Sequence, residues 1–246
     1  NSAPSINTHP VNSTICTGGN TYFNILATGS NLVYQWQVNT GSGFTNISAT
    51  GSNPSYTNWT SDTLRLTSTI SSNNGYLYRC VISGTCPSAL TSNAASLFIG
   101  SAPVITSQPN NITLCEGGST TYTTAATGTF LTYQWQVNAS GSWTDITSSG
   151  SNPTYSNWNT SVLGVNNVAS WNQGYQYRCV VSGLCSPSAT TNIANLSVNT
   201  IPSFASHPAN STVCDGSSTQ YQCVANGTNL IYQWQVNTGS GFTNIT

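Results

Sequence analysis

The hexapeptide YQWQVN fills residues 34–39 and returns unchanged at residues 133–138 and 232–237. This spacing sets a period of 99 residues, and other positions follow the same step without insertion or deletion. A fixed period is typical of repeated structural units that follow one another along a chain. We therefore expect three units, at residues 1–100, 101–199 and 200–246, of which the third holds only the N-terminal part of a unit.

Short runs of alternating apolar and polar residues lie between glycine-rich turns within each unit, and no useful helical period is found. In the first unit the expected strands are residues 11–15, 21–27, 32–38, 44–48, 63–70, 76–83 and 92–99. Alternation places Trp36 and Val38 on one side of the third strand, with Gln35 and Gln37 on the other. The pattern predicts an all-β chain of tandem β-sandwiches arranged end to end.

The third unit ends before the segment that would cover its open face. Half a sandwich cannot bury that face or pair its strand edges. We therefore expect the sequence to be a window on a longer protein; completion of the unit by another molecule is the alternative.

Charge is almost absent, since the chain has three basic residues, four acidic residues and a net charge of -1. Nucleic acid is excluded as a partner, because phosphate binding requires clustered Lys and Arg. Eight cysteines, no methionine and no CxxC pair indicate an oxidising, extracellular location. Apolar runs are too short for a membrane helix, so no membrane insertion is expected in this segment.

Several motifs resemble the immunoglobulin fold. A tryptophan lies in the third strand, and Tyr78-Arg79-Cys80 in the sixth strand has its tyrosine two residues before the cysteine, as in a tyrosine corner. The finer pattern, with Cys-x-Gly-Gly, YQWQVN and YRCVxSGxC, is similar to repeats of giant surface adhesins of Bacteroidetes, including the adhesin used for gliding motility. The resemblance implies immunoglobulin-like repeats, a cell-surface location, export by the type IX system and a structural or adhesive role.

The same resemblance guides the expected core and disulfides. Core positions are expected at Trp36, Trp135, Trp234, Cys80 and Cys179. The strand-two position that pairs with the sixth-strand cysteine in eukaryotic immunoglobulin domains holds Ile25 and Thr124 instead, so Cys80 and Cys179 are expected to be buried free thiols.

A bridge between units is expected from immunoglobulin topology. It places Cys16 at the end of its sandwich nearest the following unit and Cys86 at the opposite end, too far apart for a bond. We therefore expect a Cys16–Cys185 bridge, repeated as Cys115 with the equivalent cysteine of the third unit. The competing pair is Cys16–Cys86, which requires a different strand topology.

Groups that could perform catalysis are scarce, so the chain is not expected to be an enzyme. His9 and His207 share one position with Gln108, and Glu116 and Asp215 share a turn position with Thr17. One acid per turn is too few for calcium. No metal or cofactor is expected.

Two functions remain open. One is a structural or adhesive stalk whose partners are neighbouring repeats of the same chain. The other is a carbohydrate-binding module that uses the loop aromatics Trp59 and Trp158 to hold a polysaccharide or another cell-surface ligand. Thr63, within Asp62-Thr63-Leu64, resembles a Bacteroidetes O-glycosylation acceptor.

Overall fold

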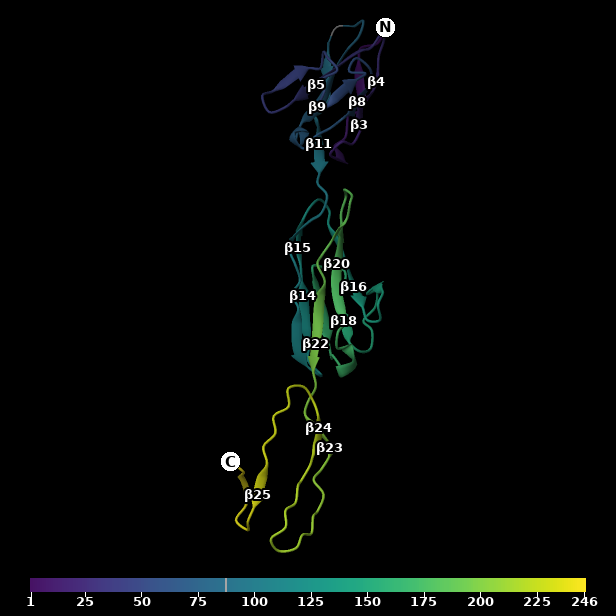
Figure 1. Ribbon diagram of the computed structural model, residues 1–246. Helices are drawn as coiled ribbons and strands as arrows, with labels where there is room; N and C mark the ends of the chain where they lie inside the picture. The colour runs from purple at the N-terminus through teal and green to yellow at the C-terminus, as the bar shows by residue number, and fades with distance from the viewer. Residues whose placement is uncertain (87) are drawn as a thin grey trace. The chain divides into compact units, whose positions relative to one another are not determined.

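The computed structural model describes residues 1–86 and 88–246, which form β-strands and two single-turn 3-10 helices (Figure 1). The expected all-β fold is confirmed. The chain folds into two compact units, whose bounds differ from those of the three sequence repeats. The first consists of residues 1–106, 126–132 and 181–189, and the second of residues 107–125, 133–180 and 190–246.

Residues 1–100 form a sandwich of two main sheets. One sheet has the order β2-β11-β9-β5-β6 with β10 added beside β9, the other has the order β3-β8-β7, and β1 pairs with β4. The elements are β1 (Ser5–Thr8), β2 (Ser13–Cys16), β3 (Thr21–Asn24), β4 (Leu26–Thr28), β5 (Val33–Asn39), β6 (Phe44–Asn46), β7 (Ser55–Thr57), β8 (Thr63–Thr67), η1 (Ser71–Asn73), β9 (Leu77–Ser83), β10 (Leu90–Thr91) and β11 (Ala95–Gly100).

The strands differ from the expected ones in two respects. The run 21–27 is divided at Ile25, because β3 pairs with β8 whereas β4 pairs with β1. Strands β1, β7 and β10 were not predicted, since each is at most four residues long and lacks a repeated apolar alternation. Short polar strands of this kind depend on their neighbours in the sheet more than on their own sequence.

The second sequence repeat forms the same arrangement. Its sheets have the orders β13-β22-β20-β16-β17 with β21 beside β20, β14-β19-β18, and β12-β15. The elements are β12 (Val104–Ser107), β13 (Ile112–Cys115), β14 (Thr120–Thr123), β15 (Ala125–Thr127), β16 (Thr132–Asn138), β17 (Trp143–Asp145), β18 (Thr154–Ser156), β19 (Val162–Asn166), η2 (Ser170–Asn172), β20 (Gln176–Ser182), β21 (Ala189–Thr190) and β22 (Ala194–Asn199).

Residues 200–246 form two isolated strand pairs. β23 (Ser203–Ser206) pairs with β24 (Val224–Asn226), and β25 (Gln235–Asn237) pairs with β26 (Phe242–Asn244). By the 99-residue period these residues correspond to residues 2–48, so they contain no counterpart of β8, β9 or β11.

One tryptophan lies at the centre of each complete sandwich. Trp36 on β5 is fully buried and lies opposite Cys80 on β9. Its indole N–H donates to the Ser61 carbonyl at 2.9 Å, and its backbone N–H donates to the Trp59 carbonyl at 2.9 Å. Trp135 is also fully buried, and its indole N–H donates to the Thr160 carbonyl at 2.9 Å. Both rings are therefore buried, and both indole N–H groups are hydrogen-bonded inside the core.

Trp234 is partly exposed, so its expected place in a core stays a prediction. Its side chain is 40% exposed, whereas Trp36 and Trp135 are 0% exposed. The reason is that residues 200–246 include no strand equivalent to β9 to lie across it.

The tyrosine of the sixth strand also differs from the expected tyrosine corner. The Tyr78 hydroxyl lies 3.5 Å from the Tyr56 hydroxyl, inside the core. The equivalent Tyr177 hydroxyl has no hydrogen-bond partner among the described residues. Burial raises the pKa of both phenols, because the charged form would lose its hydration. Ring packing fixes these side chains, as shown by the 4.8 Å between the centroids of Phe23 and Tyr78.

Replacing Trp135 with alanine should lower the free energy of unfolding of the second sandwich by about 3–5 kcal/mol, because a fully buried ring leaves a cavity. Urea denaturation followed by circular dichroism measures the loss. Trp171→Ala is the matched control, since that ring is 66% exposed and its removal should change stability little. Equal losses in the two variants would contradict the central role of Trp135.

Candidate functional site: the cystine junction

The first half of the junction is the end of strand β2. Cys16 is its last residue and lies beside Gly100, because β2 pairs in parallel with β11. The chain then turns at Gly18, whose φ of 81° is a left-handed conformation that favours glycine. The Gly18 N–H donates to the Thr69 carbonyl at 2.6 Å, which ties the turn to the loop after β8. The Cys16 side chain is thus held at a fixed point at the end of the sandwich.

The second half is the loop that follows β20. Residues 126–132 and 181–189 belong to the same compact unit as residues 1–106. The Leu184 N–H donates to the Thr129 carbonyl at 2.8 Å, and the Ser101 N–H donates to the Thr129 hydroxyl at 3.0 Å. Thr129 therefore connects the cysteine-bearing loop to the residue that follows β11.

A disulfide joins these halves. Cys16 and Cys185 are bonded, with 5.7 Å between their α-carbons, and Cys185 is only 5% exposed. This is the pair expected from immunoglobulin topology. The competing pair, Cys16 with Cys86, is contradicted, because Cys86 is a free thiol.

Gly100 leaves the space that the bridge occupies. A β-carbon placed on Gly100 would lie 3.0 Å from Leu184 Cδ2, 3.1 Å from Cys185 Sγ and 3.3 Å from Thr129 Cβ. These distances are shorter than ordinary van der Waals contacts. Sequence reasoning missed this residue, because the need for glycine arises only from segments distant in sequence.

The remaining cysteines are unpaired. Cys80 and Cys179 are fully buried, and desolvation raises the pKa of each thiol to about 12. A thiol in that state is neutral and unreactive at physiological pH. Cys115 and Cys214 are exposed, while Cys86 and Cys223 are half-buried.

One histidine candidate, His9, and one acid candidate, Glu116, make structural hydrogen bonds. His9 Nδ1 accepts the Asn93 N–H at 3.1 Å, and Gln108 Oε1 accepts the Asn192 N–H at 2.8 Å at the equivalent position. Histidine and glutamine can replace each other at this position because each side chain accepts one backbone N–H. Glu116 Oε1 accepts from the Ser170 N–H and hydroxyl at 3.2 and 3.1 Å. Among the residues described, no three His, Cys, Asp or Glu side chains gather in a way that could hold a metal.

The loop aromatics are only partly available. Trp59 is half-buried and packs against the core of the first sandwich, and Trp158 is half-buried as well. Their carbonyls accept the backbone N–H groups of the central tryptophans, which fixes both loops. Thr63, at the start of β8, is half-buried.

An arginine stacks on an aromatic ring in each sandwich, an arrangement that the sequence did not indicate. The Arg79 guanidinium lies 3.9 Å from the centre of the Phe44 ring, and the Arg178 guanidinium lies 4.2 Å from that of Trp143. Cation–π contact of this kind contributes about 0.5–1 kcal/mol at an exposed site.

Native-state alkylation should separate the thiols by their surroundings. At pH 8, iodoacetamide should modify Cys115 and Cys214 readily and leave Cys80 and Cys179 unmodified, because the buried thiols have a pKa of about 12. Peptide mass spectrometry measures the labelling, and the unfolded chain provides the control in which all free thiols react. Modification of Cys80 in the folded chain would be inconsistent with its burial.

Gly100→Ala should weaken the bridge, since crowding of this kind costs about 1–3 kcal/mol. The fraction of chains that carry Cys16–Cys185 in a glutathione redox buffer should therefore fall. Gly100→Ala should lower the free energy of unfolding less in a Cys16→Ser, Cys185→Ser variant than in the chain that carries the bridge. An unchanged oxidised fraction would show that the loop relaxes without cost.

No family model and no curated protein matches the sequence. Among the described residues no helix is long and apolar enough to cross a membrane. Solved structures match the fold. The I67–I69 fragment of the titin I-band superimposes with a TM-score of 0.71 at 17% identity, over 100% of this chain and 82% of that one.

Two further solved structures agree. Immunoglobulin domains 1–5 of Sidekick-1 match with a TM-score of 0.58 at 20% identity, over 92% of this chain and 45% of that one. The complex of Dpr2 Ig1-Ig2 with DIP-Theta Ig1-Ig3 matches with a TM-score of 0.53 at 18% identity, over 82% of this chain and 68% of that one. At these identities the likeness concerns the fold alone. The chain is built of tandem immunoglobulin-like β-domains.

Proposed function

We propose that the chain is a load-bearing stalk of an extracellular, cell-surface adhesin or filament, with repeat units bounded at residues 1–100 and 101–199 and a third beginning at residue 200. The observation that supports this most strongly is the bond between Cys16 and Cys185, residues separated by 169 positions. Tension applied to the chain passes from Cys16 through the two sulfurs to Cys185. Residues 17–184, which hold most of both complete sandwiches, lie inside the closed loop and are shielded from the load, whereas β1, β2, β21 and β22 remain on the load path.

The closed loop also stabilises the folded state. Chain-entropy reasoning gives about 5 kcal/mol for a loop of this length, because the unfolded chain loses most of its freedom when its ends are joined. A spacer that must keep its length benefits from such a constraint. The similarity of the repeats to Bacteroidetes surface adhesins, including those of gliding motility, supports a secreted location, where disulfides persist.

Several features favour a non-enzymatic role. His9 and Glu116 make structural hydrogen bonds, and the buried thiols are held neutral by their raised pKa. Neighbouring repeats of the same chain are the expected partners, through the contacts around Thr129 and Leu184.

Carbohydrate binding through Trp59 or Trp158 is the second candidate. Each ring keeps part of its surface exposed, which is the observation in its favour. Attachment of both loops to the core leaves less of each ring free to stack on a sugar. A glycan array probed with the chain, with Trp59→Ala and Trp158→Ala variants as controls, tests this function. Binding that both substitutions abolish would support it.

Single-molecule pulling from the two termini tests the load-bearing role. Reduction should release roughly 550–600 Å of additional contour length, since 169 residues extend by about 3.3–3.6 Å each. The Cys16→Ser, Cys185→Ser double variant should show the longer extension without reductant. Cys214→Ser is the matched control, because that exposed thiol is free and its loss should change nothing. Equal contour lengths before and after reduction would refute the proposed load path.

A further inference from the structure

A row of three hydrogen-bonded side chains crosses the outer face of the larger sheet in the first sandwich, away from the buried Trp36. The Arg79 Nε–H donates to Gln37 Oε1 at 2.7 Å, and Gln37 Nε2 donates to Asn46 Oδ1 at 2.8 Å. Gln37 lies opposite both residues in the sheet, so this Arg79 row runs across β9, β5 and β6. The Arg79 guanidinium also stacks on Phe44, 3.9 Å from the centre of its ring. Its position is therefore fixed on one face and along one edge.

The charge of Arg79 is unpaired. Among the strands described for this sheet, Arg79 is the only charged residue. The one acceptor described for its side chain is Gln37 Oε1, which takes one of the five guanidinium N–H donors. Arg79 is half-buried and keeps part of its surface exposed. The four N–H groups of its two terminal nitrogens are therefore available to a ligand.

A fixed guanidinium with two free terminal nitrogens matches a carboxylate. Its planar fork donates two parallel N–H bonds to the two oxygens of such a group. Because the stack on Phe44 and the bond to Gln37 hold the fork in place, little freedom is lost when an anion binds. The Arg79 row therefore has the chemistry of a carboxylate-binding site.

The second sandwich contains an equivalent row whose charge differs. Arg178 lies 4.2 Å from the centre of the Trp143 ring and donates to Gln136 Oε1 at 2.7 Å. Gln136 Nε2 donates at 2.7 Å to Asp145 Oδ1, where the first sandwich has the neutral Asn46. The carboxylate of Asp145 offsets the charge of Arg178 and repels an anion. The two rows therefore share their stacking, but only the Arg79 row carries a net positive charge.

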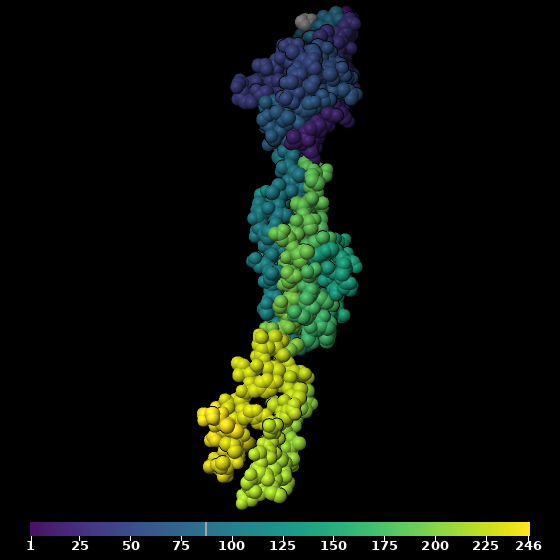
Figure 2. All heavy atoms as spheres, in the orientation of Figure 1, coloured from purple at the N-terminus to yellow at the C-terminus, as the bar shows by residue number. Residues whose placement is uncertain are grey.

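The side chains beside the Arg79 row favour a sugar over a protein as the source of the carboxylate. On β5, Gln37 lies between Gln35 and Asn39 on the outer face, so amides flank the guanidinium. Amides donate to and accept from the hydroxyl groups of sugars, whereas a protein interface has a core depleted in charge. In Figure 2 the blue-violet segment that holds the turn between β5 and β6 stands out from the body of the first sandwich. A hydroxyl-rich polymer can therefore reach the row from that side.

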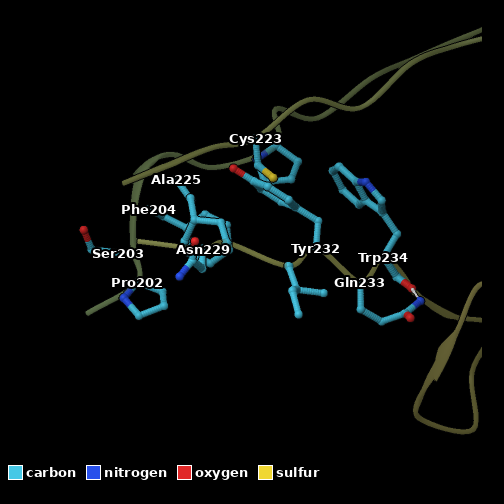
Figure 3. Close-up of a pocket in the computed structure, with 12 residues that line it drawn as sticks. Pro202, Ser203, Phe204, Cys223, Ala225, Asn229, Tyr232, Gln233 and Trp234 are labelled. Atoms are coloured by element: carbon cyan, nitrogen blue, oxygen red, sulfur yellow. Dashed lines mark hydrogen bonds between the residues drawn. The ribbon is translucent and has the colours of Figure 1, made fainter. Parts of the chain in front are cut away.

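The hollow in residues 200–246 is a different case. It is lined by Tyr232 and Trp234 among others (Figure 3). In the complete sandwiches the residues equivalent to Trp234 are Trp36 and Trp135, and both are fully buried. The equivalent space is therefore filled in a complete sandwich, and no ligand is assigned to this hollow.

We propose that the Arg79 row binds the carboxylate of an acidic polysaccharide of the uronic acid class. The two carboxylate oxygens accept from the terminal N–H groups of Arg79, and hydroxyls of the same sugar or the next one contact the amides of Gln35 and Asn39. The row around Arg178 binds more weakly, because Asp145 offsets its charge. This site is separate from the loop tryptophans and adds ligand binding to the role of a stalk.

The test uses the full chain labelled with ¹⁵N, and alginate oligosaccharides are the probe. The chain has three arginines, so three side-chain Nε–H signals in the NMR spectrum report separately on Arg65, Arg79 and Arg178. Arg65 lies on β8 of the other sheet and is exposed, which makes it the control for unspecific attraction between a cation and an anionic polymer. Neutral dextran oligosaccharides and a glutamate-rich peptide are the control ligands.

We expect the Arg79 signal to shift with alginate in a saturable way, while the Arg65 signal shows no saturation. Asn46→Asp should weaken binding at Arg79 by about two- to fivefold, the effect of one unit charge a few ångströms away in water. Asp145→Asn should strengthen binding at Arg178 by a similar factor. Both variants should fold, because each takes the residue of the equivalent position in the other sandwich, which accepts the same bond from glutamine.

Four results would overturn the proposal: shifts of all three arginine signals alike, an equal response to dextran, binding at Arg79 that Asn46→Asp leaves unchanged, or tighter binding of the glutamate-rich peptide than of alginate. The last result would identify a protein as the partner. None of these bears on the load path, because pulling measures the Cys16–Cys185 bond.

Discussion

Burial of one tryptophan between two sheets is the interaction on which each sandwich depends. Trp36 contacts the strand that carries Cys80 and, through its backbone and indole N–H groups, fixes the segment that contains Trp59 and Ser61. A single side chain therefore links both sheets and a connecting loop. Packing of this kind contributes more to a sandwich than local strand propensity does.

Uncharged polar side chains hold the loops where other proteins use ion pairs. Asn12 and Asn111 accept backbone N–H groups from Ser96 and Asn195, each at 2.8 Å. The arginine of the sixth strand stacks on an aromatic ring and donates to a glutamine at 2.7 Å in both sandwiches. The asparagine contacts carry no charge and therefore depend little on ionic strength, because screening acts on charge. The fold is thereby suited to surroundings whose salt content varies.

The sequence indicated the parts of the fold that depend on local alternation and exact repetition. Trp36 and Cys80 could be placed in the core because their strands resemble those of the immunoglobulin fold. The Cys16–Cys185 pair required the topology of a known fold, since spacing alone left two pairings open. Gly100 and the small strands β1 and β7 could not be found, because their conformations depend on neighbours distant in sequence. Trp234 and Trp36 differ in exposure although they share the same hexapeptide, because residues 200–246 include no strand equivalent to β9.

The long disulfide loop has a consequence for the lifetime of the protein in the presence of proteases. Any peptide bond between Cys16 and Cys185 can be hydrolysed without separating the chain into two molecules, because the sulfurs still connect the two ends. Exposed turns such as those around Gly41 and Gly141 lie inside this protected interval. A nicked molecule would therefore keep its continuity, and loss of continuity in that interval would require two separate events, one on the backbone and one on the bridge.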